Sequence, residues 1–198
     1  GDTLAKDWVM KAIEQGKHVV TANKALLATH GNEIFATAQK QNVMVAFEAA
    51  VAGGIPIIKA MREGLTANRI QWVAGIINGT TNFILSEMRS RGLSFADALA
   101  DAQRLGYAEA DPTFDIEGVD AAHKLSLLSS LAFGVPVQFE KAHIEGITTL
   151  AADDIAHAER LGYTVKLLGI TRAREQGIEL RVHPTLVPSD SMLAKVMP

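Results

Sequence analysis

The densest group of residues that could do chemistry lies between Gly106 and Lys124. This stretch contains five carboxylates, and Lys124 follows Asp120 by four positions, which puts both side chains on one face of a predicted helix. A partly buried lysine held by an aspartate can donate a proton to an oxyanion, because burial lowers the pKa of the ammonium group from about 10.4. Spacing alone favours the ordinary alternative, a solvated acidic loop with a surface ion pair worth about a few tenths of a kcal/mol. The apolar helix beyond Lys124, and the free amides at its start, point instead to the chemical interpretation.

Lys24 is a second candidate, because it directly follows a predicted strand in the sequence Val19-Val20-Thr21-Ala22-Asn23-Lys24. Ligands of open α/β sheets bind beyond the carboxyl ends of the strands, so a lysine in this place could contact one. A loop lysine with a solvated ammonium group is the more common outcome, and both interpretations stay open.

Two turns rich in small residues offer backbone groups to a ligand. In the segment from Glu48 to Pro56, inward-pointing carbonyls could gather a hard cation, although a tight turn between domains is the interpretation that the residues alone favour. In Asn78-Gly79-Thr80, Thr80 can cap the following helix. The same amides and hydroxyl could instead contact a substrate carboxylate.

Hydrophobic periodicity predicts the elements that must position these residues. Helices are expected at 3–13, 34–41, 57–63, 94–105, 119–133 and 153–161, with a further helix after the Asn78-Gly79-Thr80 turn. Strands are expected at 18–22, 43–47, 70–77, 165–171 and 178–182, and residues 106–118 are expected to form a polar loop. The glycine pair and proline at 53–56 are the best candidate for a domain boundary. The pattern predicts an α/β fold: the latter part of a doubly wound nucleotide-binding domain over 1–55, then an α/β domain with a mixed sheet over 56–198.

Composition and missing motifs exclude several classes of function. The chain has 198 residues, a net charge of −3 and no cysteine, so nucleic acid is not an expected partner, and a reducing cytoplasm is the expected location. No apolar run approaches the roughly 18 residues that would span a bilayer, so no membrane is expected as a partner. The sequence contains no G-x-G-x-x-G, P-loop or G-x-S-x-G motif, and its histidines show no metal-ligand spacing.

Four ordered blocks of the sequence resemble the homoserine dehydrogenase family. The most specific is Ala102-x-x-x-Gly106-Tyr107-Ala108-x-x-Asp111-Pro112-x-x-Asp115-Ile116-x-Gly118-x-Asp120-x-x-x-Lys124, and the others are VVTANKALLA, EAAVAGGIP and GIINGTTNFIL. The resemblance extends from the first residue to about Val196. It implies an NADP- or NAD-dependent oxidoreductase that reduces L-aspartate 4-semialdehyde to L-homoserine for threonine, methionine and isoleucine biosynthesis. It also implies a catalytic and dimerisation domain, and hence a homodimer or higher homo-oligomer.

The resemblance also implies roles for individual residues. Lys124 resembles the proton donor to the carbonyl oxygen, and Lys24 resembles the lysine beside the nicotinamide and the reacting carbon. The remaining matches are Asp120, Glu109, Asp115, Tyr107, Gly79 and Thr80 for substrate binding; Thr21 and Asn23, with Lys24, for cofactor binding; and Glu48, Val51, Gly53 and Ile55 for a structural sodium ion.

The sequence departs from the family at both ends. The family's glycine-rich turn, which binds the pyrophosphate, is not in this chain, and neither is a regulatory domain. We therefore expect the chain by itself to bind a nicotinamide cofactor poorly and to be inactive. Two alternatives remain: a Schiff-base lyase or aldolase that uses Lys24 or Lys124, and a non-catalytic dimerisation module.

Overall fold

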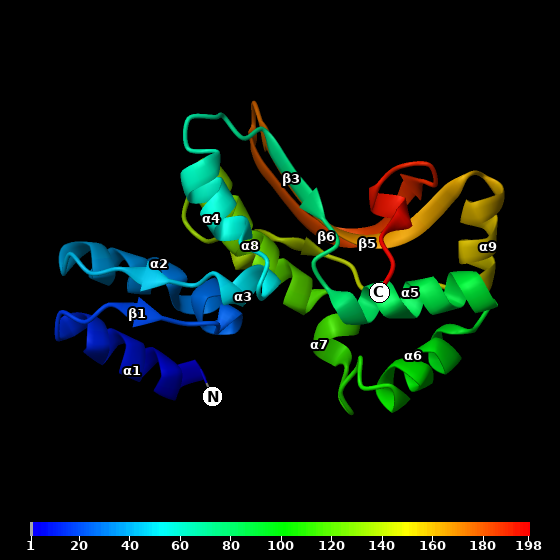
Figure 1. The fold of residues 1–198 in the computed structure, drawn as a ribbon, viewed down its shortest axis with the longest axis horizontal. Coiled ribbons are helices and arrows are strands. Elements are labelled where there is room, and N and C mark those ends of the chain that lie inside the picture. The colour runs from blue at the N-terminus through cyan, green and yellow to red at the C-terminus, as the bar shows by residue number, and fades with distance from the viewer. Residues whose placement is uncertain (1) are drawn as a thin grey trace. The chain divides into compact units, whose positions relative to one another are not determined.

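A computed structural model describes residues 2–198, which fold into two compact units (Figure 1). Unit one contains the chain up to residue 73 together with 123–142 and 171–180. Unit two contains residues 74–122, 143–170 and 181–198.

Unit one begins with alternating helices and strands, as predicted. Its helices are α1 (Asp2–Glu14), α2 (Lys24–Lys40), α3 (Ala49–Ala52), α4 (Ile57–Lys59), the π-helical η1 (Ala60–Gly64) and the 3-10 helix η2 (Phe139–Lys141). Strands β1 (Val19–Val20) and β2 (Val45–Ala46) pair in parallel, with Val19 opposite Val45. Helix α1 packs on α2, and the core between the elements includes Ile13, Leu27, Ile34 and Phe47.

The prediction that the second helix starts at residue 34 is wrong, because α2 already begins at Lys24. The Asn23 side chain caps it by accepting a hydrogen bond from the Leu26 amide at 3.0 Å. Gly31 lowers the helix propensity of this stretch, but a close contact explains its presence. A Cβ at Gly31 would lie 3.2 Å from the ring of Phe35.

A mixed sheet has the strand order β3-β5-β6-β4, which confirms the predicted fold class. Its strands are β3 (Trp72–Gly75), β4 (His143–Ile144), β5 (Tyr163–Arg174) and β6 (Gly177–Pro188). Two residues join β5 to β6, so these neighbours form an antiparallel hairpin, whereas β4 pairs with β6 in parallel. Both long strands extend beyond their predicted ends, and β4 was not predicted, because two residues carry no periodicity.

Unit two has four helices among its described residues, α5 (Gly79–Arg91), α6 (Phe95–Arg104), α7 (Thr113–Ile116) and α9 (Ala152–Arg160), with the 3-10 helix η3 (Leu193–Lys195). Helix α5 packs against α6 and α9. Helix α8 (Val119–Phe133) matches its prediction and contributes residues to both units. The prediction of an unstructured loop at 106–118 is wrong where α7 forms. Asp111 nucleates this helix by accepting hydrogen bonds from the amide and the hydroxyl of Thr113.

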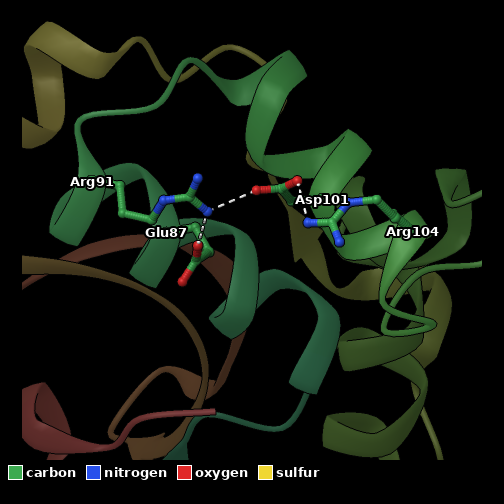
Figure 2. Close-up of polar contacts among 4 residues, drawn as sticks. All are labelled: Glu87, Arg91, Asp101 and Arg104. Atoms are coloured by element: carbon green, nitrogen blue, oxygen red, sulfur yellow. Dashed lines mark hydrogen bonds and ion pairs between the residues drawn. The ribbon is translucent and has the colours of Figure 1, made fainter.

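A four-residue ionic network ties α5 to α6 (Figure 2). One nitrogen of Arg91, Nη1, donates to Glu87 Oε2 at 2.8 Å and to Asp101 Oδ2 at 2.7 Å. Arg104 Nη2 donates to Asp101 Oδ1 at 2.8 Å. Hydrogen bonds from Arg104 and then Arg91 lower the pKa of Asp101, and those to Glu87 and Asp101 raise the pKa of Arg91.

We expect Asp101→Asn to lower the melting temperature at neutral pH and to lose this effect in acid. The folded-state pKa of Asp101 is depressed, so its stabilisation is present above the ordinary value of 3.8 and disappears as the pH falls through the folded-state value. Melting curves of both proteins between neutral pH and about pH 3 check this. A difference in melting temperature that stays constant over the whole range would contradict it.

Gly146 is a position where the fold has no room for a side chain. A Cβ there would overlap the carbonyl oxygen of Ile116 and lie 2.6 Å from the Cα of Glu117. The neighbouring Ile147 amide donates to the same Ile116 carbonyl at 2.8 Å, so the two segments cannot separate without losing that bond. This contact holds the end of α7 in place.

We therefore expect Gly146→Ala to lower the free energy of unfolding by about 1–3 kcal/mol, the usual cost of overpacking. Urea denaturation measures the change. The control is Gly54→Ala, because a Cβ at Gly54 meets nothing within 4 Å and its φ is not positive. Equal stability of the two variants would show that the backbone around Ile116 can shift to accept the added Cβ at no cost in stability.

Candidate functional site

The side chain of Asn78 is the centre of the candidate site in unit two. Its Nδ2 donates to Asp115 Oδ1 at 2.6 Å and to Asp120 Oδ2 at 2.9 Å. Its Oδ1 caps α5 by accepting from the amide of Thr81 at 2.8 Å and from the Thr81 hydroxyl at 2.9 Å. Asn78 and Asp120 are buried, at 5% and 4% exposure, and Asp115 is half-buried, so the amide joins one carboxylate that is shielded from water to another that is partly exposed.

Thr80 and Tyr107 extend this cluster toward the solvent. Thr80 Oγ1 donates to the carbonyl oxygen of Tyr107 at 2.7 Å and lies 3.4 Å from Asp115 Oδ2. The half-exposed ring of Tyr107 stacks on Phe83, with 4.3 Å between the centroids and 17° between the planes. The structure therefore brings four predicted site residues together: Thr80, Tyr107, Asp115 and Asp120.

The other predicted substrate residues lie in the same unit. Gly79 is the exposed first residue of α5. Glu109 is exposed, and its backbone carbonyl accepts from Gln103 Nε2 at 3.1 Å, which holds the loop after α6 in place. Hydrogen bonds from the hydroxyl and amide of Thr113 lower the pKa of the neighbouring Asp111 and thereby favour its ionised form.

Lys124 lies on α8 one turn after Asp120, as the spacing predicts. It is half-buried, and the residues that follow it, among them Leu125, Leu127 and Leu128, are buried. Asp120 belongs to unit two and Lys124 to unit one. The ordinary alternative, a solvated acidic loop, describes Glu109, Asp111 and Glu117, which are exposed, but it does not describe Asp120, which is buried.

The predicted cofactor residues form the turn between β1 and α2. The Thr21 hydroxyl accepts from the Asn23 amide at 3.1 Å, and Asn23 caps α2. The Thr21 amide donates to Ala46 O at 2.9 Å, so the turn lies at the carboxyl ends of the parallel strands β1 and β2. Lys24 is the half-buried first residue of α2 rather than a loop residue.

The segment predicted to bind a cation contains Glu48, helix α3 and the turn that joins α3 to α4. Both carboxylate oxygens of Glu48 accept from the first turn of α4, from Ile58 N at 2.8 Å and from Lys59 N at 2.9 Å. The carbonyl of Ile55 accepts from Ile57 N at 2.8 Å, and Gly53 has a φ of 59°. Val51 is buried within α3. The Glu48 side chain thus has a helix-capping role, and any cation here would depend on backbone carbonyls.

Sequence reasoning identified the Asn78-Gly79 turn but did not include Asn78 among the site residues. Its signal was an asparagine placed to cap a helix. Its second role, holding two carboxylates, depends on partners 37 and 42 residues away. Contacts between residues so far apart in the sequence cannot be predicted from a local sequence pattern. Within residues 2–198, no helix is long and apolar enough to cross a membrane.

Comparison with known proteins first gives the class of protein. Residues 1–48 match the family model described as the NAD binding domain of homoserine dehydrogenase, so the chain belongs with α/β proteins that have an NAD-binding domain. Residues 56–198 match the model described as homoserine dehydrogenase. The chain belongs to the homoserine dehydrogenase family.

Individual relatives agree with this family. A homoserine dehydrogenase from Pseudomonas aeruginosa is 68% identical over 196 residues, which cover 99% of this chain and 45% of that protein. The crystal structure of a homoserine dehydrogenase from Thiobacillus denitrificans superimposes on this chain with a TM-score of 0.98 at 68% identity. The match covers 100% of this chain and 46% of the Thiobacillus denitrificans chain. A hyperthermophilic archaeal homoserine dehydrogenase in complex with NADPH gives a TM-score of 0.84 at 31% identity, over 100% of this chain and 56% of its own. The chain therefore spans about half the length of these relatives.

Proposed function

We propose that this chain forms the substrate site and part of the cofactor site of a homoserine dehydrogenase. The enzyme would reduce L-aspartate 4-semialdehyde to L-homoserine with NADPH or NADH, in the cytoplasm, for threonine, methionine and isoleucine biosynthesis. The observation that carries the proposal is the buried Asn78 amide, which holds Asp115 and Asp120 together inside the region that matches the family. The comparisons support neither the lyase nor the non-catalytic alternative.

Within this proposal, Lys124 supplies the proton. Bound NAD(P)H would donate a hydride to the aldehyde carbon, and the negative charge that grows on the aldehyde oxygen is stabilised by the Lys124 ammonium group, which then transfers its proton to that oxygen. The product is an alcohol, and the cofactor leaves oxidised. Asp120 precedes Lys124 by one helical turn on α8, so the two side chains lie on the same face of the helix.

The remaining acids and hydroxyls position the substrate. Asp120 and Glu109 would hold the amino group that substrate and product share and the hydroxyl of the homoserine product, because carboxylates accept hydrogen bonds from both groups. Tyr107, Asp115, Gly79 and Thr80 would line the pocket. The contacts among Thr80, Tyr107 and Asp115 support this, since they fix the polar groups in place before the substrate arrives.

The turn formed by Thr21, Asn23 and Lys24 would contact the nicotinamide part of the cofactor. Its place at the carboxyl ends of two parallel strands fits a dinucleotide, and Lys24 would add a positive charge near the reacting carbon. The relative in complex with NADPH supports a nicotinamide cofactor for this chain. We propose that residues 1–55 serve the cofactor and residues 56–198 serve catalysis and dimerisation, a division supported by the ends of the two family matches.

We also propose that the protein is a homodimer or a higher homo-oligomer. The strands leave large apolar side chains in solvent, with Trp72 on β3 58% exposed and Leu186 on β6 54% exposed. Such residues favour burial against a second copy. Light scattering of the purified protein measures the number of chains directly.

A chimera tests the proposed function. In it, this chain replaces the 196 matching residues of the Pseudomonas aeruginosa relative. We expect the chimera to oxidise NADPH in the presence of aspartate semialdehyde and to form homoserine. A folded chimera, with cooperative melting, that consumes no NADPH with this substrate would contradict the proposed function.

The turn from Glu48 to Ile55 is proposed to bind a sodium ion through the backbone carbonyls of Glu48, Val51, Gly53 and Ile55. A bound ion stabilises only the folded state, so we expect sodium chloride to raise the melting temperature more than choline chloride at equal ionic strength. Gly53→Ala should abolish the difference, because its φ of 59° strains any side chain there. Gly54→Ala is the matched control and should retain it. Equal melting temperatures of the unmodified chain in the two salts would rule the ion out.

A further inference from the structure

Lys166 on β5 is a buried cation whose hydrogen-bond partners are uncharged. Its Nζ donates to Asn82 Oδ1 at 2.8 Å and to the Val196 carbonyl oxygen at 2.7 Å, and the residue is 2% exposed. Burial lowers the pKa of Lys166, and repulsion from the Arg89 guanidinium lowers it further. A buried ammonium group without an anion is costly, so an anion in this place would be strongly favoured.

A cavity of about 390 Å³ lies against this lysine in unit two. Its volume is within the range of roughly 300–1,000 Å³ that is typical of small-molecule sites. Lys166 and Arg89 both line it, and so does Ser86, whose buried hydroxyl has no hydrogen-bond partner in the part of the chain that the structure describes. Unsatisfied buried hydroxyls are uncommon and require an explanation.

The cavity also limits which anion can bind. Arg89 uses its Nε to contact Glu159 Oε1 at 3.1 Å, and a guanidinium carries two further nitrogens in the same plane. Glu159 lines the cavity too, so a second negative charge on a ligand would be repelled. Leu85, Val165 and Met197 provide an apolar part of the wall.

We propose that this cavity binds a small monocarboxylate, with its carboxylate at Lys166 and Arg89 and its short aliphatic part against Leu85, Val165 and Met197. The site is built from α5, α9, β5 and the C-terminal segment, and it uses none of the residues proposed for substrate or cofactor binding. It is independent of the proposed dehydrogenase activity.

Calorimetric titration of the 198-residue chain with sodium butyrate tests this site. We expect saturable binding of one butyrate per chain, and at least tenfold weaker binding of n-butanol, which has the same aliphatic part and no charge. Sodium chloride at equal ionic strength corrects for screening. Failure of butyrate to bind, or equal binding of butanol, would overturn the proposal.

Two variants locate the site. Arg89→Gln should weaken butyrate binding at least tenfold, and Lys166→Met should abolish it. The matched control is Arg104→Gln, which also removes an arginine from an ion pair, with Asp101 at 2.8 Å, but lies outside the cavity. Because Lys166 is buried and its variant can misfold, Arg89→Gln alone decides the result. Butyrate affinities that are equal in Arg89→Gln and Arg104→Gln would show that butyrate binds elsewhere.

Discussion

Lys124→Met in the chimera is expected to lower kcat by about 10²- to 10⁴-fold, the usual contribution of a general acid. Methionine has a similar length but no proton to give, so negative charge on the aldehyde oxygen would be left without a partner. The substrate would still meet Asp115 and Asp120, which the Asn78 amide holds by hydrogen bonds. We therefore expect KM to change less than kcat.

Steady-state NADPH oxidation over a range of pH measures this effect. A proton donor gives a fall in kcat at high pH in the unmodified chimera, and Lys124→Met should remove this limb of the profile. The matched control is Lys141→Met, because Lys141 is an exposed lysine at the end of η2. If Lys124→Met folds, turns over at the unmodified rate and keeps the limb, Lys124 is not the donor.

Asn78→Leu is expected to lower the free energy of unfolding by about 2–5 kcal/mol, because one change removes two kinds of interaction. The loss of a helix cap costs about 0.5–2 kcal/mol. The hydrogen bond lost by the buried carboxylate of Asp120 costs a further 1–3 kcal/mol or so, and Asp115, which is only half-buried, adds little. Leucine has the same number of side-chain heavy atoms in the same branched arrangement, so the change creates no cavity.

Urea denaturation of the chain measures this loss, and Ser94→Ala separates its two parts. Ser94 caps α6 by accepting from the Asp97 amide at 3.2 Å, and its hydroxyl donates to Asp97 Oδ2 at 2.6 Å, so it reports on a helix cap. Asn78→Asp keeps a capping oxygen but adds a third carboxylate. Repulsion raises the pKa of that group, so the variant should lose stability as the pH rises through it. Equal losses for Asn78→Leu and Ser94→Ala would mean that the amide does not hold the two acids.

Periodic segments of the fold were predictable, and short or exceptional ones were not. Helix α8 shows a long apolar pattern, and its bounds match the prediction. Helix α7 has four residues, too few for any periodicity, and depends on a local hydrogen bond from Thr113 to Asp111. The start of α2 was missed because Gly31 lowers helix propensity, whereas the Asn23 cap sets where the helix begins.

The candidate site was predictable as a set of residues but not as an arrangement. Thr80, Tyr107, Asp115 and Asp120 were identified, and their roles remain predictions. The role of Asn78 in joining Asp115 and Asp120 could not be predicted, because this residue looks locally like an ordinary helix cap. Lys166 was overlooked for a similar reason: a single lysine in an apolar strand carries no motif. The environment of Lys166 depends on a hydrogen bond to Asn82, which lies 84 residues away in the sequence.

The double hydrogen bonding of Asn78 joins the integrity of the site to that of a helix end. The same side chain accepts from the Thr81 amide and donates to Asp115 and Asp120. Fraying of the first turn of α5 and release of the two acids are therefore one opening event rather than two. The rate at which the Thr81 amide exchanges its hydrogen with deuterated solvent therefore measures how often the two acids are released from Asn78.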